Sequence, residues 1–505
     1  MTAPIPKKRP YKKDDKYSIL EYSQFLKWKT FWEVLEKDPN LTDEQKDSIK
    51  EFYWNRKTDD WKYVKGRYWN FIEENFFYID RNSRSEADFN EAWVELKVSW
   101  YKKNKNWISA KERLKLTSID FKTVREKSYK ESHLLWKCEF MLLVYYYYDN
   151  WKLDQDYFIN YVDFFQIPEK DEKIIENDYN TIIKKITDWK AHLLSEWDTL
   201  YLWACRNWRK TDKDLTEQPF NKEVKALKRA FCFKQTYMTY ILREYLSKWI
   251  HPYSLDEKKL KKTEYWSVIE NFEDVKKAWF DSYILNKFEP YIGKKASELV
   301  EEFWIKKVKI KDKKTWEEKL GYPKNVWNMI AKRMLWIQTK KIEEFEKADI
   351  ELKAIRLNMV KTPCESMSFP AFDYIEVSKQ DYYDSDLFNN FSSKRYLFVI
   401  FEYTNTKYKD DSLDNIVFTR AMFWQTPLAD LEWKIKDARL ETQRRINLRM
   451  YENLVAESEE MIIHVRMHWQ NRKDTSPTPE WWQEPKRCFW FNKMYIKEQI
   501  EKWGN

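Results

Sequence analysis

The chain has 505 residues, of which 43% are hydrophobic and 35% are charged, and its formal net charge is +9. This composition excludes a disordered chain, and no apolar run approaches the ~18 residues that a membrane span needs, so no membrane partner is expected. The length predicts at least two globular units, and the small basic excess suits a polyanionic partner without by itself indicating one.

Residues 1–20 are predicted to form a basic flexible arm, because Lys7, Lys8 and Arg9 are followed by Lys12 and Lys13. Such runs are more often solvated tails than binding elements. This segment lacks the apolar stretch of a signal peptide, and the five cysteines are scattered without a Cys-x-x-Cys pair. A reducing cytoplasm and no structural zinc are therefore expected.

A helix followed by a strand hairpin is predicted over residues 71–98. Phe71, Ile72, Phe76 and Phe77 have helical spacing, and residues 94–98 alternate between apolar and polar side chains as a strand does. In strand geometry Glu95 and Lys97 lie on one face, while Val94, Leu96 and Val98 lie on the other face, toward a core.

The hairpin carries the candidate chemistry of the chain. Asp88 and Glu95 are expected to meet across the turn, with Lys97 beside them and Glu73 contributed by the preceding helix. Magnesium prefers hard oxygen ligands, and a divalent cation with a nearby ammonium group suits phosphodiester hydrolysis. Taken alone the pattern is weak, and a solvated hairpin with a salt bridge is its ordinary interpretation.

Later segments predict a second copy of the same arrangement. Residues 140–148 and 396–401 are predicted to be buried central strands, and residues 430–440 a helix. Residues 293–300, 325–331 and 344–353 repeat, in the same order, the pattern of residues 28–35, 66–73 and 88–97. The predicted division is therefore a first domain at 21–252, a linker at 253–279 and a second domain at 280–505.

The second copy departs from the first at the candidate site. Ala331 stands where the first copy has Glu73, Glu344 where it has Asp88, and Ser392 where it has Lys137, although Glu351 and Lys353 remain. Such a site should bind magnesium poorly. The second copy is therefore predicted to bind DNA without cutting it.

Glycine and tryptophan counts are anomalous. The chain has 4 Gly and 28 Trp, where about 35 glycines are expected at ordinary usage. Trp follows Asn or Asp at five places where glycine would form an ordinary turn, and Trp28 falls opposite Gly293 in the repeat. The hypothesis is that many of these tryptophans stand for glycines, for instance through a genetic code that reads UGA as glycine; the alternative is a genuinely tryptophan-rich protein.

The segments around the candidate site resemble the MutH-like nucleases, in particular the type II restriction endonucleases that cut GATC (the Sau-three-A-one family). The matching segments extend over most of the chain: residues 65–73, 87–98, 109–114, 190–196, 229–239, 344–347, 365–372, 464–466 and 489–490. The resemblance implies an α/β fold with two tandem PD-(D/E)xK restriction-endonuclease-like domains, each a mixed sheet flanked by helices.

The resemblance also implies roles for individual residues. Glu73, Asp88 and Glu95 would be metal-site carboxylates, Lys97 the catalytic lysine and Lys137 an auxiliary basic group. Ala87 replaces the usual proline before Asp88, and Trp69 and Trp93 stand where the family has glycine. A tryptophan at position 93, two residues before Glu95, is expected to obstruct the metal or the DNA.

DNA contacts are predicted in both copies. Strand alternation would place His464, Arg466 and His468 on one face, with Arg472 just beyond, as a strand that reads a groove. A zinc-binding His464 and His468 pair and a merely solvated strand are the alternatives. In the first copy Arg206, Asn207 and Lys234 are expected near DNA.

The sequence therefore predicts a type II restriction endonuclease that hydrolyses double-stranded DNA, at GATC, with Mg²⁺. Two chains on one site or two successive nicks would cut both strands, and a cognate adenine or cytosine DNA methyltransferase is expected in the same system. The alternatives are a MutH-like mismatch-repair nicking enzyme and a catalytically dead, sequence-specific DNA-binding protein. No Gly-rich phosphate loop is present, so ATP use is not expected.

Overall fold

The computed structural model describes residues 9–55, 67–79, 86–104, 107–149, 152–206, 215–218, 224–249, 265–311, 318–337, 341–405, 412–459, 461–467 and 474–503. It divides into two compact units, Met1–Thr263 with Glu346–Ala348, and Glu264–Phe345 with Asp349–Asn505. The division falls within the segment 253–279, whose later part holds strand β11 and helix α9. Among the described residues, no helix is long and apolar enough to cross a membrane.

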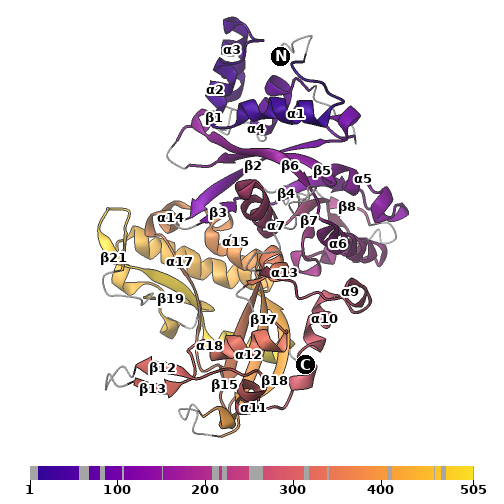
Figure 1. Cartoon of the computed structure of the whole chain (residues 1–505). Coiled ribbons are helices and arrows are strands. Elements are labelled where there is room, and N and C mark those ends of the chain that lie inside the picture. The colour runs from indigo at the N-terminus through magenta and orange to yellow at the C-terminus, as the bar shows by residue number, and fades with distance from the viewer. Residues whose placement is uncertain are drawn as a thin grey trace. The chain divides into compact units, whose positions relative to one another are not determined.

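The first unit is built on a mixed five-stranded sheet in the order β1-β6-β5-β2-β3 (Figure 1). Strand β5 (Phe140–Tyr147) is the apolar run that the sequence predicts as a central strand, and its six inner residues are buried. It runs parallel to β2 (Glu95–Asn104) and antiparallel to β6 (Phe158–Gln166). A second sheet has the order β4-β10-β7.

The remaining elements of the first unit have the following bounds: β1 (Lys29–Thr30), β3 (Trp107–Ala110), β4 (Leu114–Ile119), β7 (Leu202–Arg206), β8 (Leu215–Thr216), β9 (Ala226–Leu227), β10 (Arg229–Phe233), α1 (Lys16–Ser23), α2 (Phe31–Glu36), α3 (Asp43–Lys50), α4 (Arg67–Phe71), α5 (His133–Cys138), α6 (Glu169–Thr187) and α7 (Gln235–Tyr240).

The core of the first unit forms where helices cover the sheet. Ile19 of α1, Phe31 of α2 and Phe71 of α4 pack in one apolar cluster with Leu96 of β2 and Val144 of β5. Apolar side chains on one stripe of each helix must be removed from water, and the sheet offers the matching apolar face. The cluster therefore holds the start of β2, where Glu95 lies, at a fixed place in the fold.

The second unit repeats this strand arrangement. Strand β17 (Arg395–Tyr403), the other predicted central strand, runs parallel to β15 (Ile350–Leu357) and antiparallel to β18 (Ile416–Gln425). A second sheet has the order β16-β22-β19 and corresponds to β4-β10-β7. Strands β2, β5 and β6 thus pair in the same way as β15, β17 and β18, although the main sheet of the first unit also contains β1 and β3.

The other elements of the second unit have the following bounds: β11 (Tyr265–Trp266), β12 (Val308–Lys311), β13 (Glu318–Gly321), β14 (Lys341–Ile342), β16 (Met367–Ala371), β19 (Ile463–Met467), β20 (Thr475–Pro477), β21 (Gln483–Pro485), β22 (Arg487–Phe491), α9 (Phe272–Ala278), α10 (Phe280–Asn286), α11 (Ala296–Glu302), α12 (Val326–Met334), α13 (Glu343–Ala348), α14 (Tyr374–Lys379), α15 (Asp386–Ser393), α16 (Leu428–Asp430), α17 (Lys436–Asn447) and α18 (Lys493–Trp503).

Two expectations from the sequence need correction. The predicted flexible arm is folded from residue 9 onward, because the buried Tyr11 ring packs against Phe77 and its hydroxyl donates to the Phe77 carbonyl at 2.6 Å. In addition, Cys205 of β7 and Cys232 of β10 form a disulfide, whereas the scattered spacing predicted reduced cysteines. Strand pairing brings these two residues together across 27 positions of sequence.

Candidate active site

Asp88 and Glu95 lie at the two ends of a tight hairpin turn. Phe89 and Val94 form an isolated antiparallel bridge, and the 3-10 turn Asn90–Ala92 between them ends at Trp93, which adopts a left-handed conformation. The backbone N–H of Leu96 donates to Oδ2 of Asp88 at 2.9 Å. The turn therefore holds the Asp88 carboxylate beside the first residues of β2, as the sequence predicts.

Glu95 is the centre of a buried charged cluster. Its Oε1 lies 2.5 Å from Nζ of Lys97, and its Oε2 lies 2.8 Å from Nζ of Lys137. Val94 and Leu96 belong to the apolar cluster and the partly buried Val98 packs against it, as the alternation along β2 predicts. Lys137 reaches the site because α5 precedes β5, and β5 pairs in parallel with β2.

The electrostatics of Asp88 fit a cation site. Burial, together with the charge of Glu95, raises the pKa of Asp88 to about 6, although Lys97 and Lys137 oppose the shift. One buried and one partly buried carboxylate, close enough to repel each other, offer the hard oxygen donors that Mg²⁺ prefers, and a divalent ion would relieve their repulsion. Asp88 and Glu95 could therefore hold a divalent metal.

Glu73 does not complete a group of three carboxylates, contrary to the sequence-based expectation. Among the described residues, no group of three or more His, Cys, Asp or Glu side chains is placed to hold a metal. Glu73 is buried in the π-helical turn Ile72–Phe76, where Oε2 accepts a hydrogen bond from the Trp69 indole N–H at 2.7 Å. The indole of Trp69 thus holds the carboxylate that was expected at the metal.

The aromatic ring that contacts this site belongs to Trp69 and not to Trp93. Nζ of Lys97 lies 4.5 Å from the centroid of the Trp69 ring, within cation–π distance. Trp93 instead is 65% exposed. Sequence spacing gave no signal for the contact between Trp69 and Lys97, and the obstruction of metal or DNA by a ring at position 93 stays a prediction.

The corresponding place in the second unit has a different charge pattern. Glu351 is paired with Lys353 at 2.6 Å and with Lys394 at 3.2 Å, and the Glu351 side chain is 40% exposed, compared with 2% for Glu95. Lys394 therefore supplies the auxiliary ammonium group that the alignment of Ser392 with Lys137 suggested was lost. Sequence alignment missed Lys394 because it lies two residues further along, directly before β17.

Glu344, which stands opposite Asp88 in the repeat, is engaged by residues 267 and 268. Its carboxylate is buried and accepts hydrogen bonds from Ser267 Oγ at 2.5 Å and from the Val268 backbone N–H at 2.9 Å. The Ala331 position lacks a carboxylate altogether. The carboxylate that accompanies Glu351 is instead Asp349, which lies 3.8 Å from Nζ of Lys394.

Some of the residues predicted to contact DNA are buried, and others are partly exposed. Lys234 is 1% exposed and donates to the carbonyls of Glu196 and Thr199, so its ammonium group is committed to the fold. His464 on β19 is also 1% exposed, and burial, followed by the charge of Arg466, lowers its pKa to about 4. Arg206 at the end of β7 and Arg466 on β19 remain partly exposed. Asn207, His468 and Arg472 lie outside the described residues.

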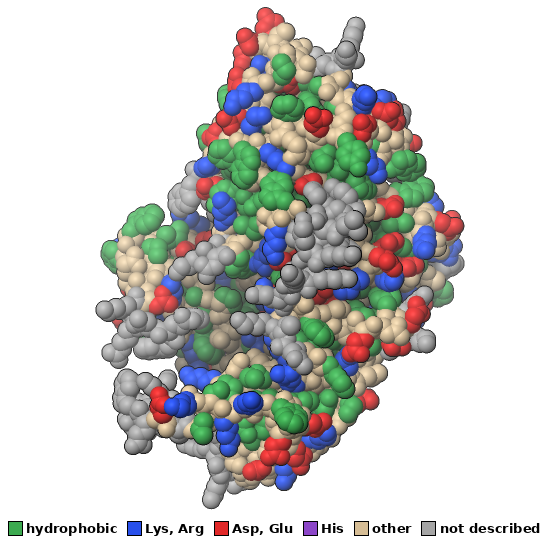
Figure 2. Space-filling view, viewed as in Figure 1, with side chains coloured by type: hydrophobic (Ala, Val, Ile, Leu, Met, Phe, Trp, Pro, Cys, Tyr) green, Lys and Arg blue, Asp and Glu red, His purple; other side chains and the backbone are tan. Residues whose placement is uncertain are grey.

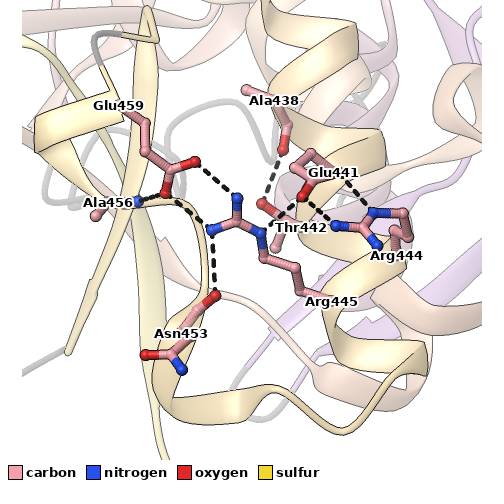
Figure 3. A network of polar contacts seen from close by, with 8 residues as sticks. All are labelled: Ala438, Glu441, Thr442, Arg444, Arg445, Asn453, Ala456 and Glu459. Atoms are coloured by element: carbon pink, nitrogen blue, oxygen red, sulfur yellow. Dashed lines mark hydrogen bonds and ion pairs between the residues drawn. The ribbon is translucent and has the colours of Figure 1, made fainter.

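An arginine network fixes the segment that leads into β19. Arg445 of α17 binds both carboxylate oxygens of Glu459 at 2.7 and 2.8 Å and the Asn453 carbonyl at 3.2 Å (Figure 3). Its Nε also lies 2.7 Å from Oε1 of Glu441. Bidentate contacts of this kind restrict orientation as well as distance. The network therefore positions the strand that carries Arg466.

Two comparisons place this site among known proteins. The family model described as DNA mismatch repair enzyme MutH matches residues 77–178, the segment that contains Asp88, Glu95, Lys97 and Lys137. The chain is also 29% identical over 475 residues to "Type II restriction enzyme Sau3AI" of Staphylococcus aureus, an alignment that covers 85% of this chain and 91% of that enzyme. The chain is therefore similar to a type II restriction endonuclease over most of its length and to MutH over the segment that holds the candidate site.

Proposed function

We propose that this type II restriction endonuclease hydrolyses both strands of double-stranded DNA at GATC with Mg²⁺ bound by Asp88 and Glu95. The cluster of Asp88, Glu95, Lys97 and Lys137 carries the proposal, because it lies in the segment that matches MutH and combines two carboxylates with two ammonium groups. Such a set can hold a divalent cation and also offset the negative charge that develops on a phosphate.

Each side chain has a distinct task in this proposal. Mg²⁺ would polarise the scissile phosphate and lower the pKa of the attacking water. Lys97, whose ammonium group adjoins Glu95, holds the water in line and offsets charge on the pentacovalent phosphorus. Lys137 contacts Oε2 of Glu95 and so keeps that carboxylate oriented. The surrounding buried side chains exclude bulk water, which strengthens these electrostatic contacts.

The two units divide the work in this proposal. Both would be PD-(D/E)xK domains, the first catalytic at 21–252 and the second, at 280–505, a DNA-binding pseudo-nuclease joined by the segment 253–279. Their shared strand order supports this assignment. Two observations support the loss of DNA cleavage in the second unit: Glu351 is half-exposed, and the Glu344 carboxylate accepts a hydrogen bond from the Val268 backbone. Arg206 and Arg466, with Asn207, His468 and Arg472, remain the candidate DNA contacts.

A plasmid assay tests the function. Unmethylated supercoiled plasmid incubated with the chain and Mg²⁺ should become linear and then fragment, with all ends at GATC, and EDTA should prevent this. With one complete site per chain, either two chains act together or a nicked intermediate accumulates first, and the time course distinguishes these. Nicked product alone would indicate a mismatch-repair-type nickase, and retarded but intact DNA would indicate a non-catalytic binding protein. Protection of the sites by adenine or cytosine methylation would support a cognate methyltransferase partner.

A further inference from the structure

Tryptophan occupies most of the left-handed backbone positions of the chain. Among the described residues, twelve non-glycine residues have a positive φ, and eight of these are tryptophans: Trp28, Trp93, Trp189, Trp249, Trp279, Trp304, Trp336 and Trp481. A positive φ brings Cβ close to backbone oxygen atoms, so glycine normally fills such positions and only Asn or Asp tolerates them readily. Large aromatic residues have no reason to gather there.

Three of the eight tryptophans terminate helices in the motif that most strongly favours glycine. After α11 the N–H of Trp304 donates to the Glu301 carbonyl at 3.0 Å and the N–H of Ile305 donates to the Val300 carbonyl at 2.9 Å. This pair of bonds defines a Schellman motif with Trp304 at its left-handed position. Trp189 after α6 and Trp336 after α12 make the same two bonds.

Trp279 adopts a conformation that is more restrictive still. It lies between α9 and α10 with φ 62° and ψ 150°. This combination falls at the edge of a region that only glycine populates to any extent. A side chain at this position is therefore strained whatever surrounds it.

The internal repeat supplies a direct comparison at Trp28. The N–H of Trp28 donates to Ile159 of β6 at 2.8 Å, and the N–H of Gly293 donates to Phe418 of β18 at 2.9 Å. Both residues have a positive φ, 62° for Trp28 and 85° for Gly293. The two units therefore build the same turn, once with glycine and once with tryptophan.

The side chains of these tryptophans give no compensating burial. All eight are 42% to 86% exposed, whereas Trp54 and Trp424 are 8% and 3% exposed and pack in the two cores. Hydrophobic side chains lie among charged ones on the face of the molecule that Figure 2 shows. These eight tryptophans therefore combine a positive φ with an exposed ring, whereas Trp54 and Trp424 are buried.

We propose that the working protein carries glycine at these eight positions, inserted by a cell that reads UGA as glycine, and that Trp54 and Trp424 are genuine. Position 93 then becomes a positioning residue for the site, because its left-handed turn joins Asp88 to Glu95. This last step rests on the proposed nuclease function. The assignment of glycine does not.

Peptide mass spectrometry of the protein purified from the cells that carry its gene tests the assignment directly. We expect glycine at the eight positions and tryptophan at 54 and 424. Tryptophan at the eight positions would overturn the proposal, whatever the protein does to DNA.

Recombinant full-length chains provide a second test with a matched control. Trp304→Gly removes both the ring and Cβ, whereas Trp304→Ala removes the ring but keeps Cβ at the positive φ. Strain of this kind shifts a folding equilibrium by about five- to thirty-fold per residue, so Trp304→Gly should melt at a higher temperature than Trp304→Ala. Equal melting temperatures would contradict the backbone argument.

The same pair of substitutions at position 93 links the assignment to activity. Trp93→Gly should cleave plasmid faster than Trp93→Ala, because only glycine relaxes the turn between Asp88 and Glu95. Equal rates would refute the positioning role. If the glycine variants melt higher but none cuts DNA, the glycine assignment stands and the proposed function fails.

Discussion

Replacing Lys97 with alanine should abolish cleavage while leaving DNA binding intact. The Lys97 and Glu95 side chains are 4% and 2% exposed and 2.5 Å apart, so Lys97 acts where water screening is weak. A positioned group that holds or moves a proton contributes about 10²–10⁴-fold to a rate, which corresponds to about 3–5 kcal/mol. Removing one partner of a buried ion pair costs about 3–5 kcal/mol of stability. Because Lys137 still pairs with Glu95 at 2.8 Å, we expect a loss of stability at the lower end of this range.

Lys353→Ala is the matched control in the second unit. Lys353 pairs with Glu351 at 2.6 Å, but the side chains are 30% and 40% exposed, and exposed pairs contribute about 0–1 kcal/mol. Single-turnover plasmid cleavage in Mg²⁺, gel retardation without Mg²⁺ and urea unfolding should be measured on both variants. A comparable loss of cleavage in the two variants would refute the division between a catalytic and a non-catalytic unit.

Three further outcomes are expected. Burial and Glu95 raise the pKa of Asp88 to about 6, so Mg²⁺ must displace a proton from Asp88 at lower pH. The half-saturating Mg²⁺ concentration for cleavage should therefore rise about tenfold per pH unit below pH 6. An unchanged Mg²⁺ requirement between pH 5 and 8 would contradict this. The pKa of His464 is lowered from 6.5 to about 4, so the unfolded chain binds a proton that the folded chain does not, and stability should fall as pH falls from 6.5 toward 4. Thermal melting at pH 7 and pH 5 should show this loss, and His464→Phe should remove most of it. Glu459→Gln should weaken the bidentate contact with Arg445 and lower the free energy of unfolding by about 1 kcal/mol. Hydrogen exchange of the backbone amides at residues 454–459 should become faster. Unchanged exchange would show that the network does not fix this segment.

Sequence patterns predicted those parts of the fold that depend on the order of apolar and polar residues within one segment. The apolar runs at 140–148 and 396–401 became β5 and β17, because a strand covered on both faces needs apolar residues throughout. The alternation around Glu95 likewise placed Val94 and Leu96 in the core. The turn between Asp88 and Glu95 followed from the same reasoning.

The remaining expectations depended on contacts between residues that are distant in the sequence. Alternation assigns His464 and Arg466 to one face of β19 but cannot say how deeply that face is covered, and His464 is buried. The carbonyl groups that bind Lys234 come from residues 35 and 38 positions away. The Trp69 indole that holds Glu73 faces Lys97 only because α4 packs near β2. None of these contacts leaves a periodic signature in the sequence.

Both carboxylate oxygens of Glu95 are engaged by ammonium groups, one by Lys97 and the other by Lys137. The charge of Glu95 is thus already compensated in this structure, and a Mg²⁺ ion bound as we propose would compete with both lysines. A DNA phosphate that draws a lysine toward itself would release one oxygen, so DNA should tighten metal binding, and by thermodynamic reciprocity metal should tighten DNA binding. Under the proposed Mg²⁺ mechanism, this pairing would therefore disfavour metal binding until DNA is bound.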